Sequence, residues 1–393
     1  MKKVQQVQQY LKDGHLDGWL LYDFHGSNPL ARYFLEISSH QMTTRRFFYW
    51  IPVKGEPIKI VHVVESQVLD HFPGEKRTFL SWQSLEREVG GALKGAKKIA
   101  MEYSPRNAIP YVSCVDGGTI DFVRSFGVEV MSSADFLSSF TAVLSKEQGE
   151  SHIRAAKACD QIVGEAWKWI QYQLAQGDPL TEYAVQQKIL TEFKKAHLMT
   201  DHPPIVGVNA HSADPHYEPL SETSAALKKG DFILIDLWAK EKQEGAVFGD
   251  ITRVGVAASR PTDLQQEIFQ IVRKAQKKGV ELVKSRFAHK KRLEGWEVDD
   301  AVRQVIREAG YGEFFIHKTG HSIETAVHGS GAHMDNLEMH DVRPLLPGTC
   351  FSVEPGIYLP GKFGVRLEHD IYIHKEGNVE ITGGEQDAII CLT

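Results

Sequence analysis

The chain has 393 residues, a formal net charge of −6 and 42% hydrophobic residues. This length exceeds one ordinary hydrophobic core and suits two domains. Acidic and basic residues are mixed along the sequence, so no basic stripe indicates nucleic-acid binding and no acidic tail indicates disorder. No run approaches the roughly 18 apolar residues of a membrane span. We therefore expect a soluble globular protein that binds neither nucleic acid nor membrane.

The start of the chain and the cysteines indicate a reducing compartment. Two lysines open the sequence, but glutamines and charges follow where a signal peptide needs an apolar stretch. The four cysteines, at positions 114, 159, 350 and 391, are far apart and show neither zinc-finger spacing nor a dense disulfide pattern. We expect a cytoplasmic protein.

The first 144 residues combine helix-like and strand-like segments. A polar helix is expected at about 4–12, and short apolar runs bounded by Gly, Pro and Asp lie at 18–22, 46–51 and 98–102. This pattern predicts an α/β domain over residues 1–144. It contains no recognisable catalytic constellation.

A polar junction at residues 144–150 marks the expected domain boundary. Ser145 and Gln148 have the spacing of a capping box, and a long helical segment follows to about Gln176. A second helix is expected from about Thr181, after which the sequence becomes rich in strand patterns and in histidine through to its end. The second domain is therefore placed at residues 145–393.

Two carboxylates lie inside neighbouring predicted strands of this second domain. Asp236 is in the middle of the apolar run 231–238, where an ionised carboxylate needs a charged partner, hydrogen bonds or a metal. Asp250 lies in the next strand-like run, 246–254. A turn centred near Gln243 would place the two acids opposite one another, with Cβ atoms about 4.5 to 5.5 Å apart.

The same arrangement recurs near the C-terminus. Glu354 and Glu368 belong to strand-like runs at 350–355 and 364–368, and a turn centred near Gly361 would make them face each other. Like charges in facing positions destabilise a sheet. Two such pairs in one domain therefore predict a shared cation.

An alternative is that each acid pairs with a nearby base, such as Arg253 or Arg366. This remains open for any single acid. The acids of each pair are 14 residues apart in both cases, and this repetition favours the shared cation. It also predicts an internal two-fold pseudo-repeat.

Histidines add nitrogen ligands to this acidic set. His317, His321 and His328 lie in one glycine-punctuated segment, and His216 lies in a loop-like stretch before the first acidic hairpin. Imidazole is both a metal ligand and a proton-transfer group near neutral pH. Seven other histidines are interpreted as structural: His25, His202, His211, His333, His340, His369 and His374.

Four carboxylates and one histidine form an oxygen-rich donor set that suits two divalent ions. The four carboxylates are those of Asp236, Asp250, Glu354 and Glu368, and the histidine segment 317–328 would supply the nitrogen. Two metals about 3.5 to 4 Å apart can share a hydroxide and make it nucleophilic at neutral pH. Hydrolysis is the expected chemistry.

The ordered set of Asp236, Asp250, His321, Glu354 and Glu368 resembles the ligand set of the pita-bread metallopeptidases, which include methionine aminopeptidase, prolidase (Xaa-Pro dipeptidase), Xaa-Pro aminopeptidase and the metal-free creatinase. The sequences at 250–253, 354–358 and 364–368 match motifs of that family. The N-terminal part is similar to the creatinase/prolidase-type N-terminal domain, which argues against methionine aminopeptidase. The resemblance implies an α/β (α+β) protein, in which that N-terminal α/β domain precedes a pita-bread catalytic domain with a curved antiparallel sheet and pseudo-two-fold symmetry.

The resemblance also implies how the ligands would be shared. Asp236 would hold one metal, Asp250 and Glu368 would bridge both, and His321 with Glu354 would complete the other. Mn²⁺ is the expected metal, with Co²⁺, Zn²⁺ or Fe²⁺ as alternatives. A hydroxide bridging the metals would attack the scissile carbonyl.

Further roles follow from the same resemblance. Glu354 would shuttle the proton, while His216 and His328 would hydrogen-bond the substrate and the tetrahedral intermediate. His317 and Arg366 would position the proline side or the carboxylate of the substrate.

Three departures from the family pattern concern the substrate pocket. The first acidic hairpin is longer than usual and carries Trp238 where a glycine is common. The segment 321–325 lacks the usual glycine-rich run, and His369 follows Glu368 where an acidic residue is usual.

The implied function is a dinuclear-metal exopeptidase that cleaves Xaa-Pro bonds in short peptides and acts as a homodimer. A metal hydrolase of the same fold acting on non-proline dipeptides or amides remains an alternative because of the changed segment 321–325. A non-catalytic binding protein and a metal-free enzyme like creatinase are disfavoured, since all five ligands are present.

Overall fold

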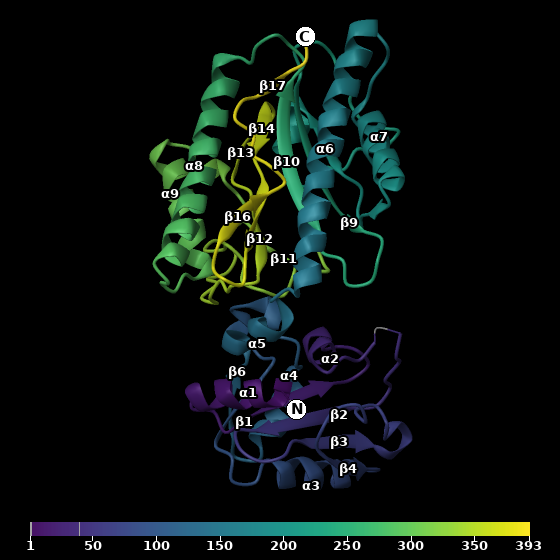
Figure 1. Ribbon diagram of the computed structural model, residues 1–393, viewed down its shortest axis with the longest axis vertical. Coiled ribbons are helices and arrows are strands. Elements are labelled where there is room, and N and C mark those ends of the chain that lie inside the picture. The colour runs from purple at the N-terminus through teal and green to yellow at the C-terminus, as the bar shows by residue number, and fades with distance from the viewer. Residues whose placement is uncertain (1, 39) are drawn as a thin grey trace. The chain divides into compact units, whose positions relative to one another are not determined.

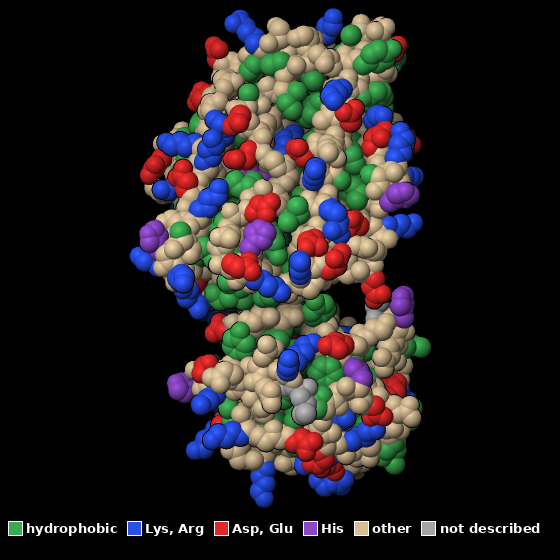
Figure 2. All heavy atoms as spheres, in the orientation of Figure 1, with side chains coloured by type: hydrophobic (Ala, Val, Ile, Leu, Met, Phe, Trp, Pro, Cys, Tyr) green, Lys and Arg blue, Asp and Glu red, His purple; other side chains and the backbone are tan. Residues whose placement is uncertain are grey.

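The computed structural model describes residues 2–38 and 40–393, which form two compact units, Met1–Thr141 and Ala142–Thr393 (Figure 1). In the described part of the chain, no helix is long and apolar enough to cross a membrane. The four cysteines all lie in this part and are free thiols. On the face shown in Figure 2, basic and acidic side chains are interspersed on both units, in agreement with the mixed charge pattern of the sequence.

The N-terminal unit is a six-stranded mixed sheet with helices, which confirms the predicted α/β architecture. Its strands have the order β4-β3-β2-β1-β5-β6, in which β1 runs antiparallel to β2 and parallel to β5. The strands are β1 Gly18–Asp23, β2 Phe47–Pro52, β3 Ile58–His62, β4 Glu75–Phe79, β5 Lys98–Met101 and β6 Glu129–Ser132. The helices are α1 Lys2–Asp13, α2 Pro29–Phe34, α3 Trp82–Ala92, α4 Gly117–Arg124 and α5 Ala134–Thr141.

The C-terminal unit begins with the two predicted helices, α6 Lys146–Gln176 and α7 Glu182–Lys195. The capping box of α6 is formed as expected. The hydroxyl of Ser145 accepts from the backbone N–H of Gln148 at 3.2 Å, and the Gln148 side chain accepts from the N–H of Ser145 at 2.9 Å.

Two further helices, α8 Asp263–Ala288 and α9 Gly295–Glu308, contradict the expectation that only strands and histidine-rich segments follow α7. Thr262 and Gln265 form a capping box at the start of α8, so the signal was present in the sequence. The apolar faces of both helices pack on the second acidic hairpin.

The strands of the C-terminal unit form mainly antiparallel sheets between the helices, and one pair, at Gly255–Val256 and Ile390–Cys391, is parallel. Figure 1 shows α6 and α7 on one side of these strands and α8 and α9 on the other. The first sheet contains β7 Leu198–Met199, β8 Ile205–Val208, β9 Phe232–Glu241, β10 Gly249–Val256 and β17 Ile390–Cys391. The others contain β11 Ser322–Ile323, β12 Cys350–Val353, β15 His369–Ile373 and β16 Val379–Thr382, and the hairpin of β13 Gly356–Leu359 with β14 Phe363–Arg366.

The predicted pseudo-repeat is visible in the order of these elements. Each half consists of two long helices followed by a hairpin that brings in two acids: α6, α7, β9 and β10, and then α8, α9, β13 and β14. In the first half β10 lies very close to α6, because a Cβ on Gly249 would be only 2.3 Å from the backbone nitrogen of Ala156. Glycine at this position therefore lets the strand that carries Asp250 pack directly on the helix.

Candidate metal centre and active-site cavity

The first acidic hairpin brings its two carboxylates to one face, but not opposite each other. In the β9–β10 ladder Asp236 pairs with Thr252, and Asp250 pairs with Trp238. The turn is therefore centred near residue 244 instead of Gln243, and the predicted direct pairing is wrong. Because the pairing is shifted by an even number of residues, both carboxylates remain on the same face of the sheet as diagonal neighbours.

The second hairpin has the predicted register. Gly356 pairs with Arg366, and Gly361 is at the centre of the turn. Glu354 and Glu368 each lie two residues beyond the Gly356–Arg366 pair, so the same register sets them opposite one another.

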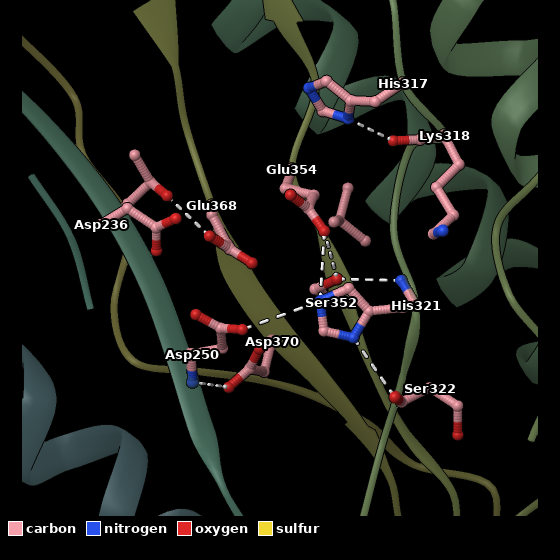
Figure 3. Close-up of polar contacts among 12 residues, drawn as sticks. Asp236, Asp250, His317, Lys318, His321, Ser322, Ser352, Glu354, Glu368 and Asp370 are labelled. Carbon is pink, nitrogen blue, oxygen red and sulfur yellow. Dashed lines mark hydrogen bonds and ion pairs between the residues drawn. The ribbon is translucent and has the colours of Figure 1, made fainter. Parts of the chain in front are cut away.

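Three of the five predicted ligands form a compact buried cluster (Figure 3). Asp250, His321 and Glu368 each offer an atom that lies within 4.8 Å of the others, and all three are at most 4% exposed. Glu354 adjoins them, because its Oε1 lies 3.3 Å from Nε2 of His321. Asp236 approaches the cluster from β9.

The tautomer of His321 makes this cluster unfavourable without a cation. Nδ1 lies 3.2 Å from the carbonyl oxygen of Ser322, which can only accept, so the proton is assigned to Nδ1. The lone pair of Nε2 then faces carboxylate oxygens of Glu354 and Asp250, at 3.3 and 3.7 Å. Burial lowers the pKa of His321 well below its usual range, so protonation does not remove this repulsion.

The carboxylates of Asp250 and Glu368 also make the cluster unfavourable without a cation. Burial and then the neighbouring charges, first Glu368, raise the pKa of Asp250 well above its usual value. Burial and the charge of Glu354 do the same for Glu368. In the described part of the chain, one oxygen each of Asp236 and Asp250 is buried without a hydrogen-bond partner. A nitrogen lone pair and crowded, unpartnered carboxylate oxygens fit divalent cations such as Mn²⁺.

One acid does have a basic partner, as the alternative explanation requires. Nη2 of Arg366 donates to Asp236. The other nitrogens of Arg366 are also engaged, since Nε donates to the hydroxyl of Thr252 at 3.2 Å and Nη1 to that of Tyr358 at 2.9 Å. Arg253 instead pairs with Asp160 at 3.1 Å. Among the four predicted carboxylate ligands, all of which lie in the described part of the chain, Asp236 is the one that forms an ion pair with an arginine, although the charge of Arg366 also acts to lower the pKa values of Glu354 and Glu368.

Two residues without a predicted role hold the cluster in place. The hydroxyl of Thr252 donates to Oε2 of Glu368 at 2.6 Å, and Asp370 accepts from the backbone N–H of Asp250 at 2.8 Å. Thr252 lies within the matched motif at 250–253, which was the available signal. Nothing in the local sequence indicated Asp370.

The cluster lies in the wall of a cavity of about 670 Å³. All nine predicted site residues line it: His216, Asp236, Asp250, His317, His321, His328, Glu354, Arg366 and Glu368. Residues without an assigned role also line it, among them Asp201, Glu218, Trp238, Lys318 and Glu338, and so does His202, which was interpreted as structural. A second cavity, of about 680 Å³, lies in the N-terminal unit, and none of the predicted ligands lines it.

The histidines differ in how firmly they are held. Nδ1 of His317 donates to the carbonyl of Lys318, and Nε2 accepts from the hydroxyl of Tyr358, both at 2.7 Å. Burial lowers the pKa of His317 to about 3, so its ring is neutral. The ring of His328 lies 4.2 Å from that of His321, centroid to centroid, and His216 is exposed within the cavity.

The segment 321–325, which departs from the family pattern, is stabilised by hydrogen bonds to Glu324. Glu324 is buried and accepts from the hydroxyls of Ser322 and Ser330, at 2.9 and 3.0 Å, and from the backbone N–H of Gly331 at 2.8 Å. A hydrogen-bonded glutamate thus braces this part of the unit instead of a glycine-rich run.

Solved structures define the fold class of the whole chain. A dipeptidase PepE from Mycobacterium ulcerans has a TM-score of 0.73 at 22% identity and covers 100% of this chain and 97% of its own. The prolidase from Pyrococcus horikoshii has a TM-score of 0.63 at 24% identity, with coverage of 99% and 100%. The fold is therefore the predicted one, an N-terminal α/β domain followed by a pita-bread domain.

The family follows from the sequence. The model of metallopeptidase family M24 matches residues 150–375, which is more than half of the chain. The chain belongs to this family of metal-dependent hydrolases. An Xaa-Pro dipeptidase of Pyrococcus horikoshii is 27% identical over 394 residues, 99% of each chain, and one of Lactobacillus delbrueckii is 34% identical over 202 residues, 50% of each.

Proposed function

We propose that this metallopeptidase is an exopeptidase that cleaves the Xaa-Pro bond of short peptides. The observation that carries the proposal is the buried cluster of Asp250, His321 and Glu368 in the wall of a cavity lined by every predicted site residue. The relatives described as Xaa-Pro dipeptidases support the substrate class.

The residues that would hold two divalent cations are Asp236, Asp250, His321, Glu354 and Glu368. Manganese is the expected metal, because the set is dominated by carboxylate oxygens. When bound, such cations polarise a carbonyl oxygen and activate water at neutral pH.

Glu354 is suited to carry a proton during hydrolysis. Glu354 lines the cavity beside His321, and the hydroxyl of Ser352 donates to its Oε1 at 3.0 Å, which fixes the orientation of the carboxylate. A general acid or base must lie within reach of the proton that it transfers. We assign to Glu354 the task of taking a proton from the attacking water and delivering it to the leaving nitrogen.

Imidazole side chains would orient the substrate. His216 and His328 line the cavity and can donate to the scissile carbonyl as negative charge develops on its oxygen. His317, held between Tyr358 and a backbone carbonyl, offers a fixed wall for the proline ring.

The test combines elemental analysis with a panel of dipeptides, with and without proline in second position, in added manganese. We expect two metals per chain and a clear preference for the proline substrates. Equal turnover of proline-free dipeptides would favour the alternative, a hydrolase of the same fold with another substrate, for which the wall braced by Glu324 is the supporting feature. No metal under any loading condition would contradict the ligand set.

Two variants separate binding of metal from turnover. Asp250→Ala should abolish both, because it removes a shared ligand, whereas His328→Ala should lower the rate with the metal content unchanged. Loss of metal in the second variant would contradict the role of His328. Homodimerisation remains a prediction, and a monomeric mass in solution would contradict it.

A further inference from the structure

A buried carboxylate outside the metal centre binds both ends of the segment 208–225. Glu182 is the first residue of α7, and its side chain is fully buried. Its Oε1 accepts from the backbone N–H of Val208 at 2.7 Å, and its Oε2 accepts from the N–H of Ala225 at 2.6 Å. One side chain therefore closes this segment into a loop.

Two side chains from within the loop contact the same carboxylate. Nδ1 of His211 lies 2.9 Å from Oε1 of Glu182, and the hydroxyl of Tyr217 donates to Oε2 at 2.7 Å. Burial, and then the hydrogen bond to Glu182, raise the pKa of Tyr217 above its usual value, so the hydroxyl keeps its proton. The two rings stack with their centroids 4.3 Å apart. The loop is thus fixed in its middle as well as at its ends.

The same loop forms part of the wall of the cavity with the proposed metal centre. Its lining residues are Pro215, His216 and Glu218. The carbonyl of Pro215 accepts from Nη1 of Arg366 at 3.3 Å. His216 directly precedes Tyr217, and neighbouring Cα atoms are held 3.8 Å apart. Any displacement of Tyr217 therefore moves His216.

His216 depends on this loop for its orientation. Among the residues that the structure describes, its ring finds no hydrogen-bond partner, and the side chain is exposed in the cavity. His317 differs, because its two ring nitrogens are bound by Tyr358 and by a backbone carbonyl. The direction in which His216 presents its imidazole is therefore set by the backbone that carries it.

Glutamine cannot replace this carboxylate without disturbing the loop. Each oxygen of Glu182 accepts from one backbone N–H, and a backbone N–H can only donate. Whichever way the amide of a glutamine is turned, its NH₂ group faces one of these two donors. The loop would lose one of its end contacts and the hydrogen bond on the same side.

We propose that Glu182 is the positioning residue of His216, which it keeps in the place where the imidazole can donate to the scissile carbonyl. This inference rests on the proposed peptidase function. It assigns a kinetic role to a buried acid that touches neither substrate nor metal in that function, and that acts through the loop 208–225.

The experiment measures kcat and KM for alanyl-proline with the manganese-loaded enzyme. Glu182→Gln should lower kcat by about 10- to 100-fold, the range for a small misplacement of a group that acts on the developing charge. KM should change less than about two-fold, because such a group contributes in the transition state. Metal content should stay at the wild-type value, since His216 is not a proposed ligand.

Two further variants accompany this one. Tyr217→Phe removes a single hydrogen bond and keeps the ring that stacks on His211, so it tests the inference even if Glu182→Gln does not fold. It should lower kcat by about 3- to 10-fold. Glu192→Gln makes the same chemical change on the same helix, where Glu192 pairs with Lys188 and Lys195, and should leave kcat unchanged.

A double-mutant cycle separates positioning of His216 from a general structural role. Each variant is combined with His216→Ala. If Glu182 acts through His216, the second change should lower kcat no further once the imidazole is gone. Hydrogen exchange gives a readout without substrate, since the amides of Val208 and Ala225 should exchange faster in Glu182→Gln than in the wild type.

Each outcome supports or overturns a separate claim. Losses of kcat that multiply in the double variants, or an unchanged kcat in Tyr217→Phe and Glu182→Gln, would overturn the role of Glu182 and leave the peptidase function standing. Full activity of His216→Ala would overturn the role of His216 and this inference with it. No turnover by the wild type would overturn the proposed function itself.

Discussion

Replacing Asp250 with asparagine is expected to reverse the order of stability between the metal-free and the metal-loaded protein. Oxygens of Asp250 and Glu368 lie within 4.8 Å of each other. Two unit charges at that separation repel by roughly 3.5 kcal/mol at an effective dielectric constant of about 20. Asparagine removes this repulsion, so without metal the free energy of unfolding should rise by about 2 to 4 kcal/mol at pH 8.

Bound metal should instead make the wild type more stable than the Asp250→Asn variant. A cation present at about 100 times its dissociation constant stabilises the folded state by about 2.7 kcal/mol. Wild type should gain at least this amount with manganese. The asparagine variant loses a shared ligand and should gain little, so the wild type becomes the more stable protein.

The assay is urea unfolding at pH 8, followed by circular dichroism, in EDTA and in manganese. Asp300→Asn is the matched control, because Asp300 is half exposed and pairs only loosely with Arg307, at 3.8 Å. It should change the stability by less than about 0.5 kcal/mol in both conditions. The reasoning would be refuted if Asp250→Asn were less stable than wild type in EDTA, or if manganese stabilised both proteins equally.

Three predictions concern the fold. His152 is fully buried with both ring nitrogens hydrogen-bonded, and burial lowers its pKa from 6.5 to about 4. The unfolded chain then binds a proton that the folded chain does not, so stability present above pH 6.5 should be lost as the pH falls, by about 2 kcal/mol at pH 5. His152→Gln should flatten this slope in urea titrations, and an unchanged slope would contradict the assignment. Gly249→Ala should lower the melting temperature, since its Cβ would meet the backbone of Ala156 in α6. The control is Gly164→Ala, also in α6, which has open space around it and should raise the free energy of unfolding by roughly 0.5 to 1 kcal/mol. Equal shifts in the two variants would argue against the close packing of β10 on α6. Ser145→Ala should cost about 1 kcal/mol and Ser145→Asp should recover most of it, as measured by thermal unfolding.

The acids could be predicted from the sequence because a carboxylate inside an apolar run stands out at once. Their side of the sheet was also predictable, since side chains alternate with a period of two. The exact pairing was not, because the polar run between Asp236 and Asp250 contains several residues that could form the turn. The second hairpin has a Pro-Gly step at Pro360 and Gly361, and there the predicted register is the observed one.

The helices α8 and α9 were missed for a different reason. Both helices carry many charged residues, and the apolar residues that pack on the second hairpin recur only with helical spacing. The capping box at Thr262 marks where the first of them begins.

Contacts between distant parts of the chain cannot be predicted from local sequence patterns. Arg366 was expected to face the substrate, and the motif around it does not indicate that it contacts Asp236, 130 positions earlier. Glu182 could have been noticed as an acid at the start of the second predicted helix. Its contacts with His211 and Tyr217 depend on how the segment after that helix folds.

The two acidic hairpins meet at the cluster, and this has a mechanical consequence. The side chain of Thr252 contacts that of Glu368 across 116 positions of sequence, and the N–H of Asp250 contacts Asp370 across 120. A cation held by both Asp250 and Glu368 closes a loop of this length as a disulfide does, and constrains the unfolded chain in the same way. The centre is then a removable cross-link between the two halves of the unit, and chelating agents should expose the seam between them to proteases.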